Sequence, residues 1–341
     1  MVSKSIFGTD KDGKVVTLYT IRNGDLSVGI LDRGATIQSL IYKGVDVALG
    51  YDDVAGYEDN GGYLGATIGR YGNRIAGGSF TVDGKQYSVD KNDDGVNHLH
   101  GGNVGYNELF WQEKSMEDNA VTLCLTDKGA DSGYPGTLAV EMRFSIEEDA
   151  LILEYSAVGD EDTPVNLTNH CYFNLSGAGN GDILDTRLQI LAGRYLPVDE
   201  KLIPTGVLRL VAGTPFDFTA PKAIGKEIKA DDKQLSYGDG YDHNYCLDGE
   251  GFRLAVQAYS PRSGITMNVF TDEVGVQFYA GNVLSSTAGK GTANGYNKWE
   301  GFCLETQHYP DSPNQPHFPS TLVKAGETYH SKTAYAFIKE E

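Results

Sequence analysis

The sequence predicts an all-β protein, built as one large antiparallel β-sandwich with very little helix. Three observations carry this prediction: apolar residues recur with a period of two, Asp-Gly turns are frequent, and helical spacing is rare. The 43 glycines and 21 tyrosines among 341 residues suit many strands joined by many turns. No linker, composition break or repeat divides the chain. Residues 1–341 are therefore expected to form a single domain, larger than an immunoglobulin-type sandwich.

The first predicted hairpin covers residues 79–89, which alternate around Asp83-Gly84. The clearest pattern lies in residues 137–158, where alternating apolar residues, an acidic turn and renewed alternation predict a hairpin with one buried face. Its expected inward residues are Leu138, Val140, Met142, Phe144, Ile146, Leu151, Leu153 and Tyr155. Only residues 221–235 show helical spacing, with a narrow apolar face. A third hairpin is predicted at residues 253–270, around the turn SPRSG.

Composition and charge exclude several classes of partner. The chain carries 28 Lys and Arg against 47 Asp and Glu, a formal net charge of −19. Nucleic acids and anionic membranes are bound by basic surfaces, so neither is an expected partner. The N-terminus has no apolar signal core, no run approaches a membrane span, and the four cysteines lack zinc-site spacing. A soluble protein of the reducing cytoplasm is therefore expected.

Two glycine-rich stretches contain polar side chains that a plain sandwich does not need. Residues 69–78, GRYGNRIAGG, offer Asn73 and Arg74 as hydrogen-bond donors without forming a known phosphate-binding glycine motif. Residues 238–245, GDGYDHNY, form a predicted turn in which Asp242 can accept hydrogen bonds from two hydroxyl groups on adjacent carbon atoms of a ligand. The structural alternatives are an arginine that ties a loop to carbonyl groups and a turn aspartate that bonds its own backbone.

Histidines stand out in two further stretches. On a strand, His98 and His100 of VNHLHGG (96–102) would point to the same face, as two metal ligands do. No carboxylate follows at a recognisable spacing, so a hydrogen-bonded pair or a sugar-binding histidine is expected in place of a metal site. His170 of PVNLTNHCYFNL (164–175) stands among asparagines and aromatic residues, a setting that suits a sugar ligand. A capped core histidine is the alternative.

Glu305 interrupts an apolar strand. It lies between Leu304 and Thr306 in CLETQHYPDSPNQP (303–316), where a half-buried strand pattern gives way to an irregular, proline-rich stretch. A buried core carboxylate is one interpretation, and a catalytic base at a strand end, covered by a loop, is the other. Nucleophilic catalysis is not expected, because the chain has no GxSxG motif and no cysteine in a recognised nucleophile setting.

Together, these stretches resemble the motifs of the aldose 1-epimerases, or galactose mutarotases, in order and spacing. The matching motifs are GATIQSLIYKG, GRYGNRIAGG, LHGG, VNLTNHCYFNL, GYDHNY, VQFYAGN and LETQHYPDSPNQPHFPS. The resemblance covers essentially the whole chain, and the last motif is the most diagnostic. It implies a supersandwich of the galactose mutarotase type, with the sugar in an open cleft on one sheet.

The resemblance also implies a reaction and a role for individual residues. Glu305 would be the catalytic base and His170 the catalytic acid. The sugar would be bound or positioned by Asn73, Arg74, His100, Tyr172, Asp242 and Gln277. The reaction would interconvert the α and β anomers of free hexoses such as D-galactose and D-glucose, with no metal or other cofactor. The attraction between a glutamate anion and an imidazolium is expected to favour both charge states near neutral pH.

Other functions stay open at this point. A glycoside hydrolase would need two carboxyl groups, about 5–5.5 or 6.5–9.5 Å apart, for which Glu305 and Asp242 are candidates. A non-catalytic carbohydrate-binding protein would not need both His170 and Glu305. A hexose-phosphate epimerase of the same fold would need a basic phosphate pocket, which the motifs do not indicate. The expected partner is a small aldose sugar, and the expected assembly is a monomer or a weak homodimer.

Overall fold

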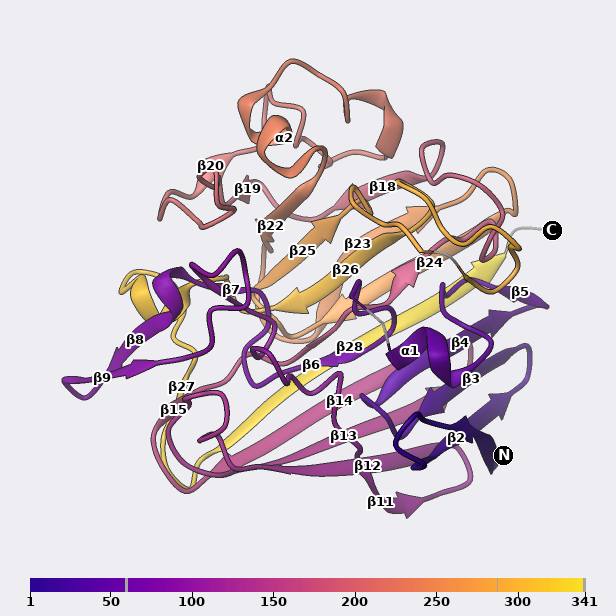
Figure 1. Cartoon of the computed structure of the whole chain (residues 1–341). Coiled ribbons are helices and arrows are strands. Elements are labelled where there is room, and N and C mark those ends of the chain that lie inside the picture. Colours follow the sequence, from indigo (N-terminus) through magenta and orange to yellow (C-terminus); the bar gives the residue numbers. More distant parts are fainter. Residues whose placement is uncertain (59–60, 287, 340–341) are drawn as a thin grey trace.

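The computed structural model describes residues 1–58, 61–286 and 288–339, and it confirms the all-β prediction (Figure 1). Three antiparallel sheets of five, nine and six strands dominate it. Helix in the described residues is confined to α1 (Val54–Glu58), α2 (Lys233–Gly238) and three 3₁₀ turns (Ala76–Gly78, Ile224–Lys226 and Ser312–Asn314). No helix in this part of the chain has both the length and the apolar character needed to cross a membrane.

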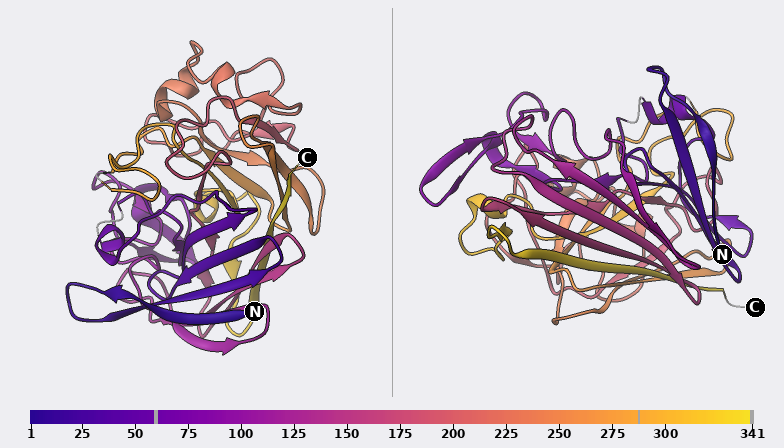
Figure 2. Two further views of the ribbon diagram at one scale, coloured as in Figure 1. Left: turned by 90° about the vertical axis from the view of Figure 1, so that its right-hand side faces the viewer. Right: turned by 90° about the horizontal axis from the view of Figure 1, so that it is seen from below.

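The five-stranded sheet follows chain order. Its strands are β1 (Val2–Thr9), β2 (Val15–Asn23), β3 (Leu26–Leu31), β4 (Thr36–Tyr42) and β5 (Val45–Asp46). Strand β2 contacts two strands of the nine-stranded sheet, β12 (Ala120–Asp127) and β13 (Leu138–Glu147). Figure 2 shows these indigo N-terminal strands beside the long magenta and yellow strands. The buried residues of the five-stranded sheet, such as Ile21, Val28 and Ile37, belong to the main hydrophobic core.

The nine-stranded sheet forms the base of the molecule. Its order is β11 (Gln112–Met116), β12 (Ala120–Asp127), β13 (Leu138–Glu147), β14 (Ala150–Gly159), β28 (Thr328–Lys339), β24 (Ile265–Thr271), β23 (Arg253–Tyr259), β18 (Arg187–Ile190) and β21 (Lys222–Ala223). The hairpin predicted at residues 137–158 is β13–β14, and all eight residues expected to face inward are buried. The C-terminal strand β28 inserts between β14 and β24, a long-range pairing that no local pattern announces.

The two other predicted hairpins are also confirmed. Strands β8 (Ser79–Val82) and β9 (Lys85–Ser88) join through Asp83 and Gly84, whose φ angles are 48° and 79°. Both angles are positive, as a tight two-residue hairpin turn requires, and Asp-Gly favours that geometry. Strands β23 and β24 pair across the turn at residues 260–264.

The helical pattern of residues 221–235 is misleading over most of its length. The segment forms strand β21, a 3₁₀ turn and bends, and α2 begins only at Lys233. There the side chain of Asp232 caps the helix by accepting a hydrogen bond from the Gln234 amide. Because β21 pairs with β18 at the sheet edge, strand pairing prevails over a weak amphipathic pattern.

The six-stranded sheet lies over the nine-stranded one. Its order is β17 (Tyr172–Phe173), β26 (Phe302–Gln307), β25 (Gly275–Tyr279), β22 (Asp242–Cys246), β19 (Arg194–Tyr195) and β20 (Arg209–Leu210). One face packs on β28, where the Thr306 and Thr333 hydroxyl groups are 2.6 Å apart. The remaining short strands are β6 (Thr67–Ile68), β7 (Arg74–Ile75), β10 (His98–Leu99), β15 (Thr163–Pro164), β16 (Thr168–Asn169) and β27 (Leu322–Val323). The other face of the six-stranded sheet is free to line a site.

Candidate active site

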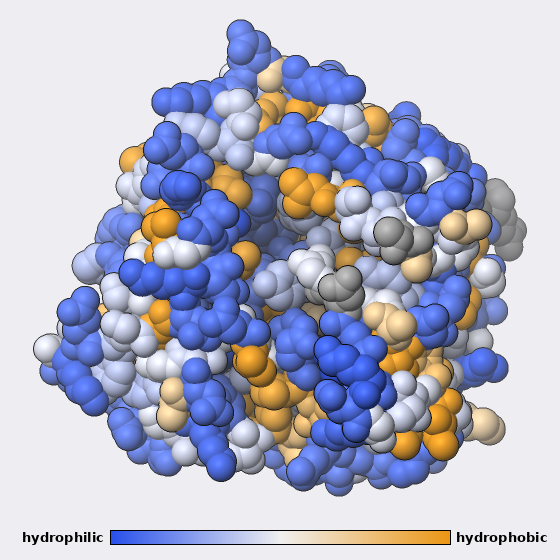
Figure 3. Space-filling model, viewed as in Figure 1, coloured by the Kyte–Doolittle hydropathy of each residue, from blue (hydrophilic) through white to orange (hydrophobic). Residues whose placement is uncertain are grey.

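Polar and aromatic side chains line the second face of the six-stranded sheet. Since alternate residues of a strand point to opposite faces, Glu305 points away from the side that Leu304 and Thr306 occupy. The strand register forms two rows across this face: Asp242–Tyr279–Cys303–Tyr172 and Asn244–Gln277–Glu305. The molecule is hollowed near the middle of the side shown in Figure 3, over the region of β25 and β26 in Figure 1. Glu305 thus interrupts an apolar strand because that strand has a core face and a cleft face.

His170 brings an imidazole to the Glu305 carboxyl group. It lies between β16 and β17, and its Nε2 is 3.8 Å from Oε1 of Glu305. Its Nδ1 is 3.5 Å from the Cys303 sulfur atom, and its ring centroid is 5.2 Å from that of His100. Side-chain ligand atoms of His100, His170 and Glu305 all lie within 4.8 Å of one another. The structure therefore brings together three groups that are far apart in the sequence.

The hydrogen bonds of His100 define its protonation. Its Nδ1 accepts a hydrogen bond from the backbone N–H group of Asn73 at 3.0 Å, so the ring proton lies on Nε2. Burial lowers the pKa of His100 well below its usual value, and its neighbours His170 and Arg74 act in the same direction. His100 is therefore a neutral donor through Nε2, a suitable partner for a sugar oxygen.

The neighbouring His98 has a different, structural role. Its Nδ1 lies 2.8 Å from the Asp90 carbonyl oxygen, and its Nε2 lies 2.5 Å from the Tyr134 hydroxyl. Strand β10 ends at Leu99, and His100 has a positive φ of 51°. The two histidines therefore do not continue one strand face, and the expectation that they point the same way is wrong.

His100, His170 and Glu305 are also the one cluster among the described residues with a spacing that could hold a metal ion. The hydrogen bond at His100 opposes this use. Coordination through Nε2 would move the ring proton to Nδ1, where it would face the N–H group of Asn73. The donor set therefore fits hydrogen bonding to a ligand better than metal coordination.

The other residues predicted to bind the sugar surround this cluster. Gln277 donates a hydrogen bond to Asp242 at 2.7 Å, and Arg74 donates one to Asp93 at 2.9 Å. Asn73 has a positive φ of 63°, and its side-chain oxygen accepts a hydrogen bond from the Arg74 amide. The prediction of a turn position for Asp242 is wrong, since this residue begins β22. Pairing of β22 with β25 aims the carboxylate into the cleft.

Burial controls the electrostatics of the central pair. Burial raises the pKa of Glu305 well above its usual value; the charge of Asp242 adds to this and that of Arg74 opposes it. Burial lowers the pKa of His170 to about 4. Both shifts favour the neutral forms, a protonated Glu305 and a neutral His170. The expected stabilisation of both charges by mutual attraction is wrong here, because 3.8 Å exceeds a hydrogen bond and desolvation dominates.

Two aromatic residues of the site were missed by sequence reasoning. The Tyr63 ring packs 4.9 Å from the His100 ring and 5.7 Å from the His170 ring. Tyr279 packs 6.0 Å from Tyr172 and 6.4 Å from His170. The alternation that starts at Gln277 could have identified Tyr279, which lies two residues further on the same face. Tyr63 lies outside any strand with a positive φ of 58°, so no periodic signal identifies it.

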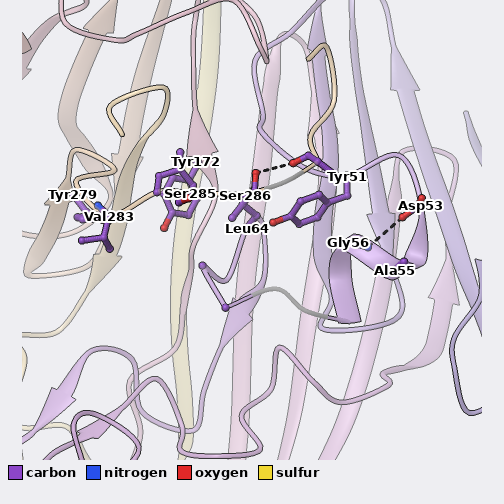
Figure 4. A pocket seen from close by; sticks show the side chains of 14 residues that line it. Tyr51, Asp53, Ala55, Gly56, Leu64, Tyr172, Tyr279, Val283, Ser285 and Ser286 are labelled. Carbon is purple, nitrogen blue, oxygen red and sulfur yellow. Dashed lines mark hydrogen bonds between the residues drawn. The ribbon is translucent and has the colours of Figure 1, made fainter. Parts of the chain in front are cut away.

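A pocket adjoins the central cluster (Figure 4). Its volume is about 510 Å³. Tyr172, Tyr279 and Val283 border one side of it, and Tyr51 and Asp53 lie on the opposite side. The pocket lining includes none of His100, His170 and Glu305, but Tyr172 and Tyr279 contact both His170 and this open space, so the pocket lies beside the cluster.

Comparison with known proteins identifies relatives along nearly the whole chain. Residues 17–336 match the family model described as aldose 1-epimerase. The galactose mutarotase of Bos taurus is 40% identical over 343 residues, which cover 98% of each chain. The aldose 1-epimerase of Escherichia coli (strain K12) is 40% identical over 340 residues, covering 96% of this chain and 97% of that protein. The galactose 1-epimerase structure from Lactobacillus acidophilus NCFM has a TM-score of 0.88 at 28% identity, covering 100% of this chain and 99% of that one.

Proposed function

The chain belongs to the aldose 1-epimerase family, and from this premise we propose that Glu305 is its catalytic base and His170 its catalytic acid. It is an isomerase that interconverts the anomers of an aldose sugar. We propose free hexoses, D-galactose and D-glucose among them, as its substrates. The observation that carries the assignment is the approach of His170 Nε2 to Glu305 Oε1, 3.8 Å apart on the wall of the cleft.

Anomer exchange requires two proton transfers. The base takes the proton of the C1 hydroxyl group while the acid protonates the ring oxygen, and the bond between C1 and the ring oxygen breaks. The resulting aldehyde rotates about its C1–C2 bond and closes on its other face, with both proton transfers reversed. Each positioned proton-transfer group typically contributes about 10²–10⁴-fold to the rate. A carboxyl group and an imidazole on one cleft wall supply both.

The pair of Glu305 and His170 is active when the two side chains together hold one proton. With two protons it has no base, and with none it has no acid. The one-proton state is present between the pKa of His170, about 4, and the raised pKa of Glu305. Within that state the proton must move from Glu305 to His170 before the sugar reacts. The limits of activity therefore belong to the pair as a whole.

The surrounding side chains hold the sugar ring in place. We propose that His100 donates to a ring hydroxyl through Nε2 and that Arg74, Asn73, Gln277 and Asp242 bind the others. Asp242 is an acceptor that one amide already orients, as its 2.7 Å bond with Gln277 shows. The Tyr172 ring is suited to contact the CH groups of the sugar. A misplaced ring would slow both proton transfers.

We also propose a single domain over residues 1–341, acting in the cytoplasm as a monomer or weak homodimer without a metal or other cofactor. The single-domain proposal is supported by the main core cluster, which contains residues of all three large sheets, such as Ile30, Phe144 and Phe302. The net charge of −19 supports a small neutral ligand over nucleic acid or an anionic membrane.

Polarimetry of freshly dissolved α-D-galactose and α-D-glucose tests this function. The protein is expected to speed the approach to anomeric equilibrium, with full activity after dialysis against EDTA. No acceleration would favour a non-catalytic sugar-binding protein, and hydrolysis of an aryl glycoside would favour a glycosidase. Activity lost in EDTA and restored by zinc would contradict the metal-free mechanism.

Removing one sugar-binding charge is expected to weaken binding. In Arg74→Ala and Asp242→Ala, KM is expected to rise by roughly tenfold or more, since a hydrogen bond to a charged group is typically worth about 1.5–3 kcal/mol. Turnover is expected to fall as well, because the ring is less well positioned. Arg143→Ala is the matched control: Arg143 pairs with Glu117 and Glu154 on the nine-stranded sheet. Unchanged kcat and KM in both site variants would mean that these residues only fasten loops.

A further inference from the structure

A second group of polar side chains surrounds Gly275 on the cleft face. Gln307 is directly opposite Gly275 in the strand register, and Gln277 lies two residues further along β25. Gln277 in turn pairs with Glu305 on one side and with Asn244 on the other. Cross-strand neighbours are about 5 Å apart and residues i and i+2 about 7 Å. With Cys246, the partner of Gly275 on β22, these four polar side chains lie around a position that has no side chain of its own.

All four side chains carry buried polar atoms without a hydrogen-bond partner among the described residues. These atoms are both amide atoms of Asn244, both amide atoms of Gln307, Oε1 of Gln277 and Oε2 of Glu305. Asn244 is 2% exposed, Gln307 0%, Gln277 4% and Glu305 2%. Buried polar groups in folded proteins are nearly always paired, with protein atoms or with ordered water. This group therefore indicates a ligand that both donates and accepts hydrogen bonds.

Other groups lie close to Gly275 and Gln307. A Cβ atom on Gly275 would lie 2.7 Å from Oδ1 of Asn244 and 3.1 Å from the ring of Tyr309, so both side chains lean over the glycine. On the other side, Oε1 of Gln307 lies 3.7 Å from the Cβ position of Gly72, in the loop that carries the sugar-binding Asn73. A ligand here would be small and buried, unlike a hexose.

We propose that Asn244, Gln277 and Gln307 form a binding site for a buried water molecule that donates a hydrogen bond to Oε2 of Glu305. Water has two donors and two acceptors, so one molecule can pair four of the six atoms: the amide nitrogens of Asn244 and Gln307, Oε1 of Gln277 and Oε2 of Glu305. This inference rests on the proposed role of Glu305 as the base. Asn244 and Gln307 act through the water, so they are positioning residues.

The water would stabilise the charged form of Glu305, which burial disfavours. A hydrogen bond donated to a carboxylate favours its charged form. Within the one-proton state, it therefore shifts the proton from Glu305 to His170, the arrangement from which the sugar reacts. Loss of the water would reduce the population of that arrangement and raise the pH at which Glu305 finally ionises.

Other groups around Glu305 also influence its ionisation. The titratable and charged groups that face it are Arg74, His100, His170, Tyr172, Asp242, Tyr279, Cys303 and Tyr335. A substitution at Gln307 changes none of these side chains. A shift in the pH profile of such a variant therefore reports the contribution of the amide and the water it holds.

Gln307→Met tests the site because it keeps side-chain length and apolar packing but removes both amide atoms. We expect the plateau of kcat/KM against pH to fall roughly tenfold. We expect its alkaline limb, the fall in kcat/KM at high pH, to move up by about one pH unit, since the loss of one hydrogen bond to a charged group typically changes an equilibrium by about tenfold. Asn244→Leu is expected to shift the limb in the same direction. Because both residues bind one water, the double variant is expected to shift it no further than the larger single change.

Thr306→Val is the matched control. Thr306 neighbours Gln307 but points to the nine-stranded sheet, where its hydroxyl group hydrogen-bonds that of Thr333. The alkaline limb of the pH profile of Thr306→Val is therefore expected to stay in place. A lower kcat/KM in Gln307→Met with an unshifted limb would indicate packing alone and overturn the water site. That failure differs from failure of the proposed function, in which Glu305→Gln itself would stay active.

A high-resolution crystal structure shows whether the site holds a water molecule or a sugar hydroxyl group, since both can make the same hydrogen bonds. Sugar-free crystals are expected to show a water within about 3.2 Å of the Gln307 amide and of Oε2 of Glu305. Density that appears only after soaking with D-galactose would assign the site to a sugar hydroxyl and overturn the proposal. A direct hydrogen bond between the Asn244 and Gln307 amides, with no water, would overturn it as well.

Discussion

Glu305→Gln is expected to lower kcat by at least about 10²-fold, because it removes the general base and keeps the shape of the side chain. The glutamine can still occupy the position opposite Gln277 and bind a sugar hydroxyl, so KM is expected to change far less than kcat. Polarimetry of α-D-galactose at several sugar concentrations separates the two constants. A variant within a few-fold of the wild-type kcat would contradict the assignment of Glu305 as the base.

The stability of the same variant provides an independent check. Burial raises the pKa of Glu305 in the folded protein above its unfolded value, so folding favours the protonated form. The associated stability is present below the unfolded pKa and is lost as the pH rises through the folded pKa. Glu305→Gln cannot ionise, so at neutral pH it is expected to unfold at a temperature no lower than that of the wild type.

Glu273→Gln is the matched control for a buried carboxyl group. Glu273 is 3% exposed, but its oxygens are paired with His308 at 2.7 Å and with the Tyr329 hydroxyl at 3.2 Å. A change there is expected to alter stability and to leave kcat within a few-fold of the wild type. The contrast isolates the effect of removing the cleft carboxyl group beside His170 from the general effect of replacing a buried glutamate.

His170→Gln is expected to lower kcat by roughly 10²–10⁴-fold, because an amide can hydrogen-bond to the ring oxygen but cannot protonate it. The affinity for sugar is expected to change less, since the remaining polar side chains of the cleft are intact. Polarimetry measures both effects. The fall in kcat is expected across the whole pH range, because the variant lacks the acid in every protonation state.

His100→Gln serves as the comparison for His170→Gln. His100 is a neutral donor whose Nδ1 already accepts a hydrogen bond from the backbone amide of Asn73, so its proposed role is to orient the sugar, with no proton to exchange at Nδ1. Its replacement is expected to reduce kcat less than that of His170. If His100→Gln were the more damaging change and His170→Gln nearly active, His100 would have to be assigned as the acid.

The three predicted hairpins show which parts of the fold are encoded locally. The period-two pattern of residues 137–158 reports directly which side chains of β13 and β14 are buried, because each strand has one core face. Asp83-Gly84 specifies its own turn through the two positive φ angles that it tolerates. The prediction of helix over residues 221–235 was wrong for most of the segment, because its weak helical pattern competed with a strand pairing to β18, over 30 residues away.

The motifs of the sequence also supplied the candidate residues of the site. The order of the glycine, histidine and LETQH motifs was sufficient to select Glu305, His170 and the sugar-binding candidates by resemblance. The same motifs could not show that Asp242 begins a strand or that Tyr63 packs on both histidines. Those facts depend on loops and strands that meet only in the folded chain.

By itself, then, the sequence determined the all-β class and the hairpins, because alternation and turn chemistry are local properties, and its motifs supplied the proposed catalytic pair by resemblance. Only the tertiary structure decided the 3.8 Å separation of His170 and Glu305 and the tautomer of His100. It also decided the directions of the two pKa shifts, opposite to the charge states expected from pairing. The physical reason is that desolvation depends on every element packed around a group, and no stretch of sequence specifies those neighbours alone.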